Sequence, residues 1–371
     1  MADMTTDVTA SARTLRAGFV GAGFMATVHS RAARAAGAEL TGGASSSPER
    51  ASAAVERLGL ANAFGSVDEL LADPDIDVVH VCTPNTTHAA IALAALEAGK
   101  HVICEKPLAT SVADAERLRT LAAERGLVAA VPFVYRFHPM AREARARVAA
   151  RETGRLLSVH GAYLQDWLAA PHDDDWRVDR ALGGPSRAFA DIGSHLVDLV
   201  EFISGDRIVR LNSTIRTVYE RRATNVDIAT EDLVAVVVEM ASGAVGTLLV
   251  SQVAPGRKNA LSIELSGTDA SVRFEQERPD RLWVGRAEAS SLIERDPARL
   301  APDAARLSLV PAGHPMGYQD AFNAFVADAY AAVAGTRPDG LPGFDDGARA
   351  VRVTDAVLRS AASGTWAEVA A

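Results

Sequence analysis

The first third of the chain alternates short apolar runs with stretches of good helix formers, and no other feature constrains the fold as strongly. The apolar runs occupy residues 15–21, 38–44, 77–82, 101–104 and 127–131, and the helical stretches lie at 25–36, 48–58, 86–98 and 112–125. Repeated strand–helix–strand units build a parallel sheet covered by helices on both faces. We therefore predict an α/β domain with a parallel sheet over residues 15–135.

The pattern changes to long β-rich segments after about residue 136. One helix is expected at 139–150 and two more at 318–333 and 346–362. Between them we expect strands at 156–165, 208–219, 232–240, 244–253, 262–267, 271–276 and 281–284. Turn residues separate neighbouring runs at hairpin spacing. The segment 136–371 is therefore predicted to be an α+β domain with a large, mostly antiparallel sheet, and a chain of 371 residues is long enough for two domains.

Charge and composition exclude several classes of partner. Lys and Arg number 38 against 47 Asp and Glu, so the net charge is 38 − 47 = −9, with no basic run to attract nucleic acid or an anionic membrane. Residues 1–14 lack the apolar core of a signal peptide and are expected to form a disordered leader. The two cysteines make neither a disulfide framework nor a zinc pattern, and no histidine has metal-ligand spacing. We expect a soluble, cytoplasmic protein without a metal site.

A glycine-rich turn follows the first predicted strand. Gly21, Gly23 and Ala26 fit the pattern G-x-G-x-x-G/A, with Phe24 and Met25 opening a helix. The first glycine permits the tight turn, the second lets the backbone approach a pyrophosphate, and the small third residue allows close packing of helix on strand. The turn predicts a dinucleotide site.

The end of the second strand bears on which dinucleotide binds. NAD-specific sites usually carry an acidic residue here, whereas this chain has Ser45, Ser46 and, one helical turn on, Arg50. Hydroxyls and a guanidinium suit the 2′-phosphate of NADP. The other interpretation is structural: Ser47 caps a helix that begins at Pro48, and Arg50 is a solvated charge. NAD and NADP both remain open, and we favour NADP.

Three further stretches carry polar residues to the same region: 81–88 (VCTPNTTH), 105–107 (EKP) and 191–198 (DIGSHLVD). The first two follow predicted strands, and ligands of open α/β sheets bind beyond the carboxyl ends of the strands. With GAGFMA before them, these motifs resemble the family of glucose–fructose oxidoreductases, inositol dehydrogenases and rhizopine-catabolism proteins (Gfo/Idh/MocA), from about residue 15 to the last helix. The resemblance implies a Rossmann domain, an open-faced sheet domain, NAD(P)-dependent oxidation or reduction of sugars, polyols or cyclitols, and homodimers or homotetramers.

The resemblance also assigns roles to single residues. Lys106 matches the lysine that contacts both the reacting hydroxyl and the nicotinamide ribose, His195 the general acid/base, and Asp191 the acid beside it. The loop facing the cofactor is matched by Thr83, Pro84, Asn85 and His88, with Glu105 beside the nicotinamide ribose. Further similarity to sugar-active members and to the segment leaving the first domain implies these substrate residues: Tyr135, Arg136, Gln165, Trp167, Trp176 and Arg177.

The oxidation of an alcohol requires the same residue types, although each residue also has a purely structural interpretation. Oxidation of an alcohol needs a base, and histidine serves near neutral pH. Either Asp191 or Asp198 could orient His195; alternatively, Asp191 caps a helix and His195 lies in the core. Trp167 and Trp176 could be packing residues. Besides a dehydrogenase, two functions remain open: glycosidic cleavage through transient cofactor redox, and a non-catalytic cofactor sensor.

Overall fold

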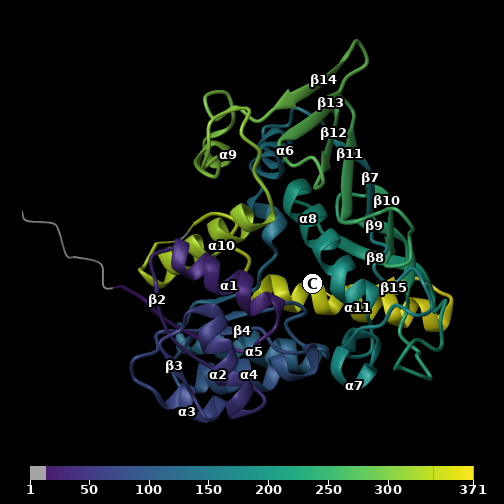
Figure 1. Cartoon of the computed structure of the whole chain (residues 1–371). Helices are drawn as coiled ribbons and strands as arrows, with labels where there is room; N and C mark the ends of the chain where they lie inside the picture. Colours follow the sequence, from purple (N-terminus) through teal and green to yellow (C-terminus); the bar gives the residue numbers. More distant parts are fainter. Residues whose placement is uncertain (1–13, 337, 371) are drawn as a thin grey trace, which may run out of the picture.

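The computed structural model of the chain describes residues 14–336 and 338–370, so the predicted leader lies outside it except for residue 14. The first unit holds a six-stranded sheet in the order β3-β2-β1-β4-β5-β6, in which every pairing is parallel. Figure 1 shows this unit in purple and blue at the lower left. The strands are β1 (Arg16–Val20), β2 (Glu39–Ala44), β3 (Asn62–Ala63), β4 (Val78–Val81), β5 (His101–Cys104) and β6 (Ala129–Ala130).

The helices of the first unit begin at residues suited to capping. The side chains of Ser47, Ser66 and Ser111 each accept a backbone N–H of the first turn. The helices are α1 (Phe24–Ala35), α2 (Pro48–Leu58), α3 (Val67–Ala72), α4 (His88–Glu97) and α5 (Val112–Arg125), with a 3-10 turn, η1 (Asn85–Thr87), ahead of α4. The predicted parallel α/β sheet is confirmed, and α3 is an element that was not predicted.

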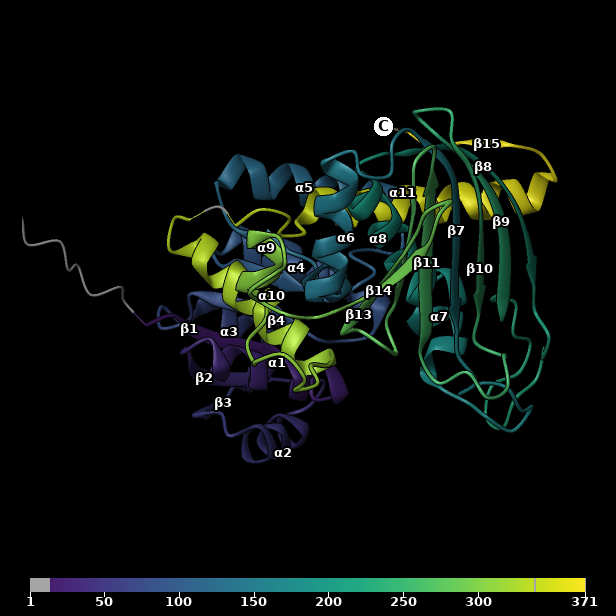
Figure 2. The ribbon, with the colours of Figure 1, turned by 90° about the horizontal axis from the view of Figure 1, so that it is seen from above.

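The second unit is built on a nine-stranded sheet in the order β14-β13-β12-β11-β7-β10-β9-β8-β15. All its pairings are antiparallel except that of β10 with β7. Figure 2 shows these long strands side by side, at the right of the molecule. They are β7 (Leu156–Leu164), β8 (Ile208–Arg216), β9 (Leu233–Met240), β10 (Val245–Ser251), β11 (Ala260–Gly267), β12 (Ser271–Glu275), β13 (Arg281–Gly285), β14 (Ser290–Glu294) and β15 (Ala367–Glu368).

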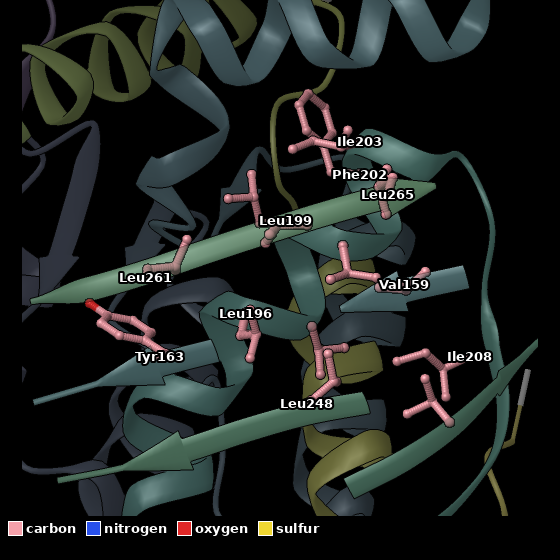
Figure 3. Close-up of a cluster of buried hydrophobic side chains, with 14 of the residues drawn as sticks. Val159, Tyr163, Leu196, Leu199, Phe202, Ile203, Ile208, Leu248, Leu261 and Leu265 are labelled. Carbon is pink, nitrogen blue, oxygen red and sulfur yellow. The ribbon is translucent and has the colours of Figure 1, made fainter. Parts of the chain in front are cut away.

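One face of this sheet forms the main core. Alternate residues of β9 and β10, such as Val236, Val238 and Val250, are buried, whereas Val237 and Val245 between them are exposed. The buried face packs on helix α8, whose Leu196 and Leu199 meet Val159, Leu248 and Leu261 of the strands (Figure 3). Helix α8 (Ser194–Ser204) follows a π-helical turn, η4 (Phe189–Gly193).

The last two long helices complete the first unit. Phe322 and Phe325 of α10 (Tyr318–Val333) join the core over one face of the parallel sheet, beside α1 (Figure 1). Phe344 and Val351 of α11 (Phe344–Ser363) join the core over the other face, beside α5. Shorter elements are η2 (Val134–Phe137), α6 (Pro139–Ala149), η3 (Trp176–Val178), α7 (Arg180–Gly183) and α9 (Pro302–Arg306). None of the helices in the described part of the chain is long and apolar enough to cross a lipid bilayer.

Candidate active site

A cleft of about 1530 Å³ opens where the carboxyl ends of β1, β4 and β5 face the second unit. Both units contribute to its walls, and all but one of the predicted site residues line it. The exception is Arg136. The predicted residues that line it are Gly21, Gly23, Phe24, Met25, Ser45, Ser46, Arg50, Thr83, Pro84, Asn85, His88, Glu105, Lys106, Tyr135, Gln165, Trp167, Trp176, Arg177, Asp191 and His195.

The glycine-rich turn has the geometry that a pyrophosphate needs. Gly21 has φ +110°, and a Cβ there would lie 2.4 Å from the carbonyl oxygen of Cys82. A Cβ on Gly23 would meet nothing within 4 Å, so the backbone is open to an approaching ligand. Gly23 also precedes α1 without any side-chain cap, which leaves the first N–H groups of that helix free for an anion. The turn therefore fits a dinucleotide.

The adenosine end of the cleft is basic and carries hydroxyls. Ser47 caps α2 and Pro48 opens it, as the structural interpretation predicts, yet Arg50 also lines the cleft and donates to the Ser46 hydroxyl at 3.2 Å. Arg57, which was not predicted, lines the same wall and donates to the Thr27 hydroxyl at 2.9 Å. The carboxylates that line the cleft lie elsewhere in it, and none comes from β2 or α2.

Hydrogen bonds hold the loop after β4 on two sides, one toward the buried His88 and one across the cleft to the second unit. The His88 ring is fully buried, with Nδ1 2.8 Å from the Pro107 carbonyl and Nε2 2.8 Å from the Thr83 carbonyl. A neutral ring donates to only one of them. Asn85 donates its amide to the carbonyl of Gly183 at 3.0 Å, which ties the loop to α7 of the second unit. His88 and Asn85 therefore hold this loop in place along the wall of the cleft.

Lys106 and Asp191 form the polar centre of the cleft. The lysine Nζ lies 2.5 Å from Oδ1 of Asp191 and donates to the Asp191 carbonyl at 2.9 Å. Gln252, a fully buried residue that the sequence did not reveal, donates to the other carboxylate oxygen at 2.7 Å. Burial alone would raise the pKa of Asp191, but the charges of Lys106 and Arg177 lower it to about 2. The carboxylate therefore stays ionised and holds the lysine in place.

His195 lies near this pair as an uncharged ring. Its centroid is 5.0 Å from that of Tyr135 and 5.7 Å from that of Phe133. Burial, and then the charge of Lys106, lower the pKa of His195 to about 3. Its Nδ1 is buried and has no hydrogen-bond partner among the residues described. Asp191 and His195 line the same cleft, but neither Asp191 nor Asp198 hydrogen-bonds the ring.

The prediction of Arg136 as a substrate residue does not match its position. Its guanidinium is buried and donates to both carboxylate oxygens of Asp198 and to Asp346, the last at 2.7 Å. Both carboxylate oxygens of Asp198 thus accept from Arg136, and Asp198 makes no hydrogen bond to His195. The reason is local: η2 presents Tyr135 to the cleft and the next residue to the opposite side.

A network of hydroxyls and amides surrounds the substrate end of the cleft. The Tyr135 and Tyr163 hydroxyls lie 2.5 Å apart, and the Asn259 side-chain oxygen accepts from Tyr163 at 2.7 Å and from Gln165 at 2.8 Å. Trp167 donates to the side-chain oxygen of Gln165 at 2.7 Å. These groups are suited to the hydroxyls of a polar ligand.

A second aromatic side chain faces the same space beside a charged pair. Trp176 lies under the guanidinium of Arg177, 4.4 Å from the ring centroid, and Arg177 in turn donates to Asp175 at 3.0 Å. Tyr163, Asn259 and Tyr318 line the cleft but were not predicted. The pairing of β7 with β11, which brings Tyr163 beside residues 259–261, is the signal that could have found two of them.

Comparison with known proteins gives consistent matches over nearly the whole chain. A family model described as "Oxidoreductase family, NAD-binding Rossmann fold" (GFO_IDH_MocA) matches residues 15–133, and a GFO/IDH/MocA C-terminal domain matches 141–273. Levoglucosan dehydrogenase of Pseudarthrobacter phenanthrenivorans is 32% identical over 96% of this chain and 98% of its own length.

Solved structures agree with these matches. A levoglucosan dehydrogenase in complex with NADH and levoglucosan superposes with a TM-score of 0.91 at 32% identity, covering 96% of this chain and all of its own. An inositol dehydrogenase homologue of Azotobacter vinelandii, with NADH and myo-inositol, gives a TM-score of 0.86 at 29% identity, covering 96% and 98% of the two chains.

Proposed function

The chain belongs to the GFO/IDH/MocA oxidoreductase family, and from this membership we propose which residues carry its reaction and which substrates it takes. The protein is an NAD(P)-dependent oxidoreductase that transfers hydride between the nicotinamide and a CH–OH carbon of a sugar, polyol or cyclitol. The observation that supports our assignment of residues is the Lys106–Asp191 pair, held beside His195 in the same cleft as the glycine-rich turn.

The chemistry divides among three side chains. When bound, the nicotinamide ring supplies the acceptor for the hydride. His195 lines the cleft beside Lys106 and takes the proton of the substrate hydroxyl as a general base. The Lys106 ammonium stabilises the negative charge that develops on the substrate oxygen. Asp191 holds that ammonium in place through its carboxylate and its backbone carbonyl.

The charges of the cleft support an uncharged substrate. At the sugar end, Lys106 is paired with Asp191, and Arg177 is paired with Asp175. Each cation is therefore already balanced by a carboxylate, which disfavours a phosphate or carboxylate group on the substrate, while the ammonium keeps its third N–H for the substrate oxygen. The hydroxyl network around Asn259 and the faces of Trp167 and Trp176 suit a cyclic sugar instead. Levoglucosan is the first compound to test, because one relative that matches over 96% of this chain is a levoglucosan dehydrogenase.

For the cofactor we propose NADP in preference to NAD. The support is the adenosine wall, where Ser45, Ser46, Arg50 and Arg57 line the cleft and no carboxylate comes from β2 or α2 to accept a ribose hydroxyl. The relatives with NADH bound leave this preference open to measurement. We also propose the two predicted domains, 15–135 and 136–371, and a homodimer or homotetramer that forms through the exposed face of the nine-stranded sheet.

The test is the absorbance of reduced nicotinamide during incubation with levoglucosan, myo-inositol, free hexoses and a hexose phosphate, each with NAD and with NADP. We expect turnover of uncharged compounds only. Lys106→Ala should lose about 10²- to 10⁴-fold of kcat while its cofactor Kd is unchanged. Arg50→Ala should weaken NADP by about tenfold or more without weakening NAD, because a hydrogen bond to a charged group contributes about 1.5–3 kcal/mol.

The contradicting outcomes are distinct. Wild-type turnover in Lys106→Ala would overturn the assignment of residues. Equal weakening of NAD binding and NADP binding in Arg50→Ala would overturn the proposed preference for NADP. Turnover of the hexose phosphate alone would overturn the uncharged substrate. Substrate consumed without net reduced nicotinamide would indicate glycosidic cleavage through transient redox. A cofactor sensor would bind NADP and turn over nothing.

A further inference from the structure

A buried chain of hydrogen bonds leads away from Glu105 into the core of the first unit. Its members come from three elements: His29 of α1, His80 of β4 and Tyr330 of α10. His29 Nε2 lies 3.0 Å from Glu105 Oε1, and the Nδ1 atoms of the two histidines lie 2.9 Å apart. His80 Nε2 lies 2.8 Å from the Tyr330 hydroxyl. None of the three inner residues lines the cleft.

The chain of bonds lies in an apolar and aromatic environment. His29 and His80 are fully buried and Tyr330 is 5% exposed. The His80 ring stacks on Phe19 at 4.8 Å, and the His29 ring is 4.7 Å from Phe322. A buried polar group without a partner is costly in such a place, so each contact in the chain must join one donor to one acceptor.

For a neutral His29 this requirement leaves a single arrangement of hydrogens. The Glu105 carboxylate accepts the Lys106 backbone N–H at Oε2, at 3.1 Å, and accepts at Oε1 too, so His29 carries its hydrogen on Nε2. The Nδ1 of a neutral His29 is then an acceptor, and His80 must donate from its own Nδ1. The Nε2 of His80 accepts in turn, and Tyr330 is the terminal donor.

We propose that Tyr330, His80 and His29 form a relay of positioning residues that fixes both histidine tautomers and thereby orients the Glu105 carboxylate beneath the Lys106 backbone. Each donor in the relay points toward Glu105. The carboxylate in turn holds the backbone of the residue whose ammonium meets Asp191. The relay therefore acts on the reaction through Glu105, and none of its three members touches the substrate.

The relay also connects the cleft to the second half of the chain. Helix α10 lines the cleft with Tyr318 at its first residue and donates to the relay with Tyr330, three turns later. The catalytic part of the inference rests on the proposed function, because Lys106 is taken as the reacting lysine. The arrangement of hydrogens does not rest on it, so the two can fail separately.

The first test reads the tautomers directly in the cofactor-free protein. In 15N-histidine-labelled protein, two-bond 1H–15N spectra distinguish protonated from unprotonated ring nitrogens. We expect His80 as the Nδ1–H tautomer and His29 as the Nε2–H tautomer, each assigned through a protein that lacks that histidine. An Nε2–H tautomer of His80, or rapid exchange between its tautomers, would overturn the proposal whether or not the enzyme is active.

The second test removes only the terminal donor. In Tyr330→Phe the ring remains and the hydroxyl is lost, so the Nε2 of His80 loses its donor and the population of the Nδ1–H tautomer, which His29 alone then selects, should fall. We expect kcat to fall by about 10- to 100-fold, because small displacements of a reacting group have effects of that size. The sugar KM should stay near the wild-type value, since no relay residue lines the cleft. Unchanged kcat and unchanged tautomers would contradict the relay.

The matched control is Ser360→Ala, which deletes another buried hydroxyl, one that bonds Ser213 and Thr365 far along α11. It should lower the melting temperature without changing kcat or the histidine spectra. If Tyr330→Phe behaves in the same way as this control, Tyr330 only stabilises the fold and the relay is wrong.

Discussion

At the scale of single residues, Arg136 shows how a motif residue can serve the fold. Its guanidinium joins three elements, because it lies in η2 and bonds Asp198 of α8 and Asp346 of α11. The ring of Phe202 packs below it, 4.9 Å from the centre of the charge. A buried charge is tolerated only with such partners, so this side chain is expected to hold the two units together.

Arg136→Lys tests that role. A lysine has no planar fork and cannot bond both carboxylates in the same geometry, so the free energy of unfolding should fall by about 1–3 kcal/mol. Denaturant titration measures the loss. The sugar KM should be unchanged because Arg136 does not line the cleft. A raised KM with unchanged stability would contradict this structural role and support the original prediction that Arg136 contacts the substrate.

The sequence could point to those residues of the candidate site that belong to a recognisable motif. Lys106, Asp191 and His195 belong to short motifs with a required residue type, and the structure brings them into one cleft. Asn259 and Gln252 lie in no motif: Asn259 lines the cleft and Gln252 bonds Asp191 from below it, and both are placed by the pairing of strands far apart in sequence. Arg136 lies in a short 3-10 turn, where a shift of one residue reverses the side to which a side chain points. Hydrophobic periodicity does not reveal such a shift.

At the scale of elements, the turn between β1 and α1 separates two uses of glycine. Gly21→Ala should destabilise the protein by about 1–3 kcal/mol or more, because a side chain is strained at this positive φ and collides with the Cys82 carbonyl. Gly23→Ala should leave thermal stability unchanged, since nothing lies within 4 Å of the added methyl group. Its cofactor affinity should fall by about tenfold, the effect of 1.4 kcal/mol of lost contact.

Melting temperature and cofactor titration by fluorescence distinguish the two variants, and each serves as the other's control. Equal stability loss in both would show that Gly23 also has a role in the fold. Unaltered cofactor affinity in Gly23→Ala would place the pyrophosphate elsewhere in the cleft.

Elements with strong local signals were predicted closely, and those that depend on distant partners were not. Helix α5 has Ser111 as its cap, a glycine after its end and the predicted bounds 112–125. Strand β15 has two residues and exists because it pairs with β8, more than 150 positions earlier. The π-helical turn η4, which leads directly into α8, likewise has no signature in the periodicity.

At the scale of the whole molecule, buried uncharged histidines set the response to acid. Burial lowers the pKa of His138 from its ordinary value of 6.5 to about 4, and burial and then the Lys106 charge lower that of His195 to about 3. Burial also lowers the pKa values of His80 and His88. Below pH 6.5 the unfolded chain therefore binds protons at these histidines, whereas the folded protein does not. Stability should fall from pH 6.5 toward 4, by about 1.4 kcal/mol per pH unit for each of His138 and His195.

Thermal unfolding across this pH range measures the slope. His138→Phe keeps an aromatic ring against Tyr135 and removes one titrating group. The decrease in unfolding free energy per pH unit should therefore be smaller, by the contribution of one bound proton. His172→Gln is the control, because that ring is 82% exposed and should leave the slope unchanged. A slope that His138→Phe does not alter would contradict the role given to burial.

The way α10 and α11 cover the parallel sheet has a consequence for synthesis. Phe322 and Phe325 close one face of the cofactor-binding unit, and Phe344 and Val351 close the other. While the ribosome is still making the second sheet, the first 135 residues of the nascent chain thus expose apolar surface that only residues after 317 can cover. The cofactor-binding unit precedes these helices in the chain, so it cannot complete its core until they emerge, and a chaperone that protects its apolar faces would have to remain bound until then.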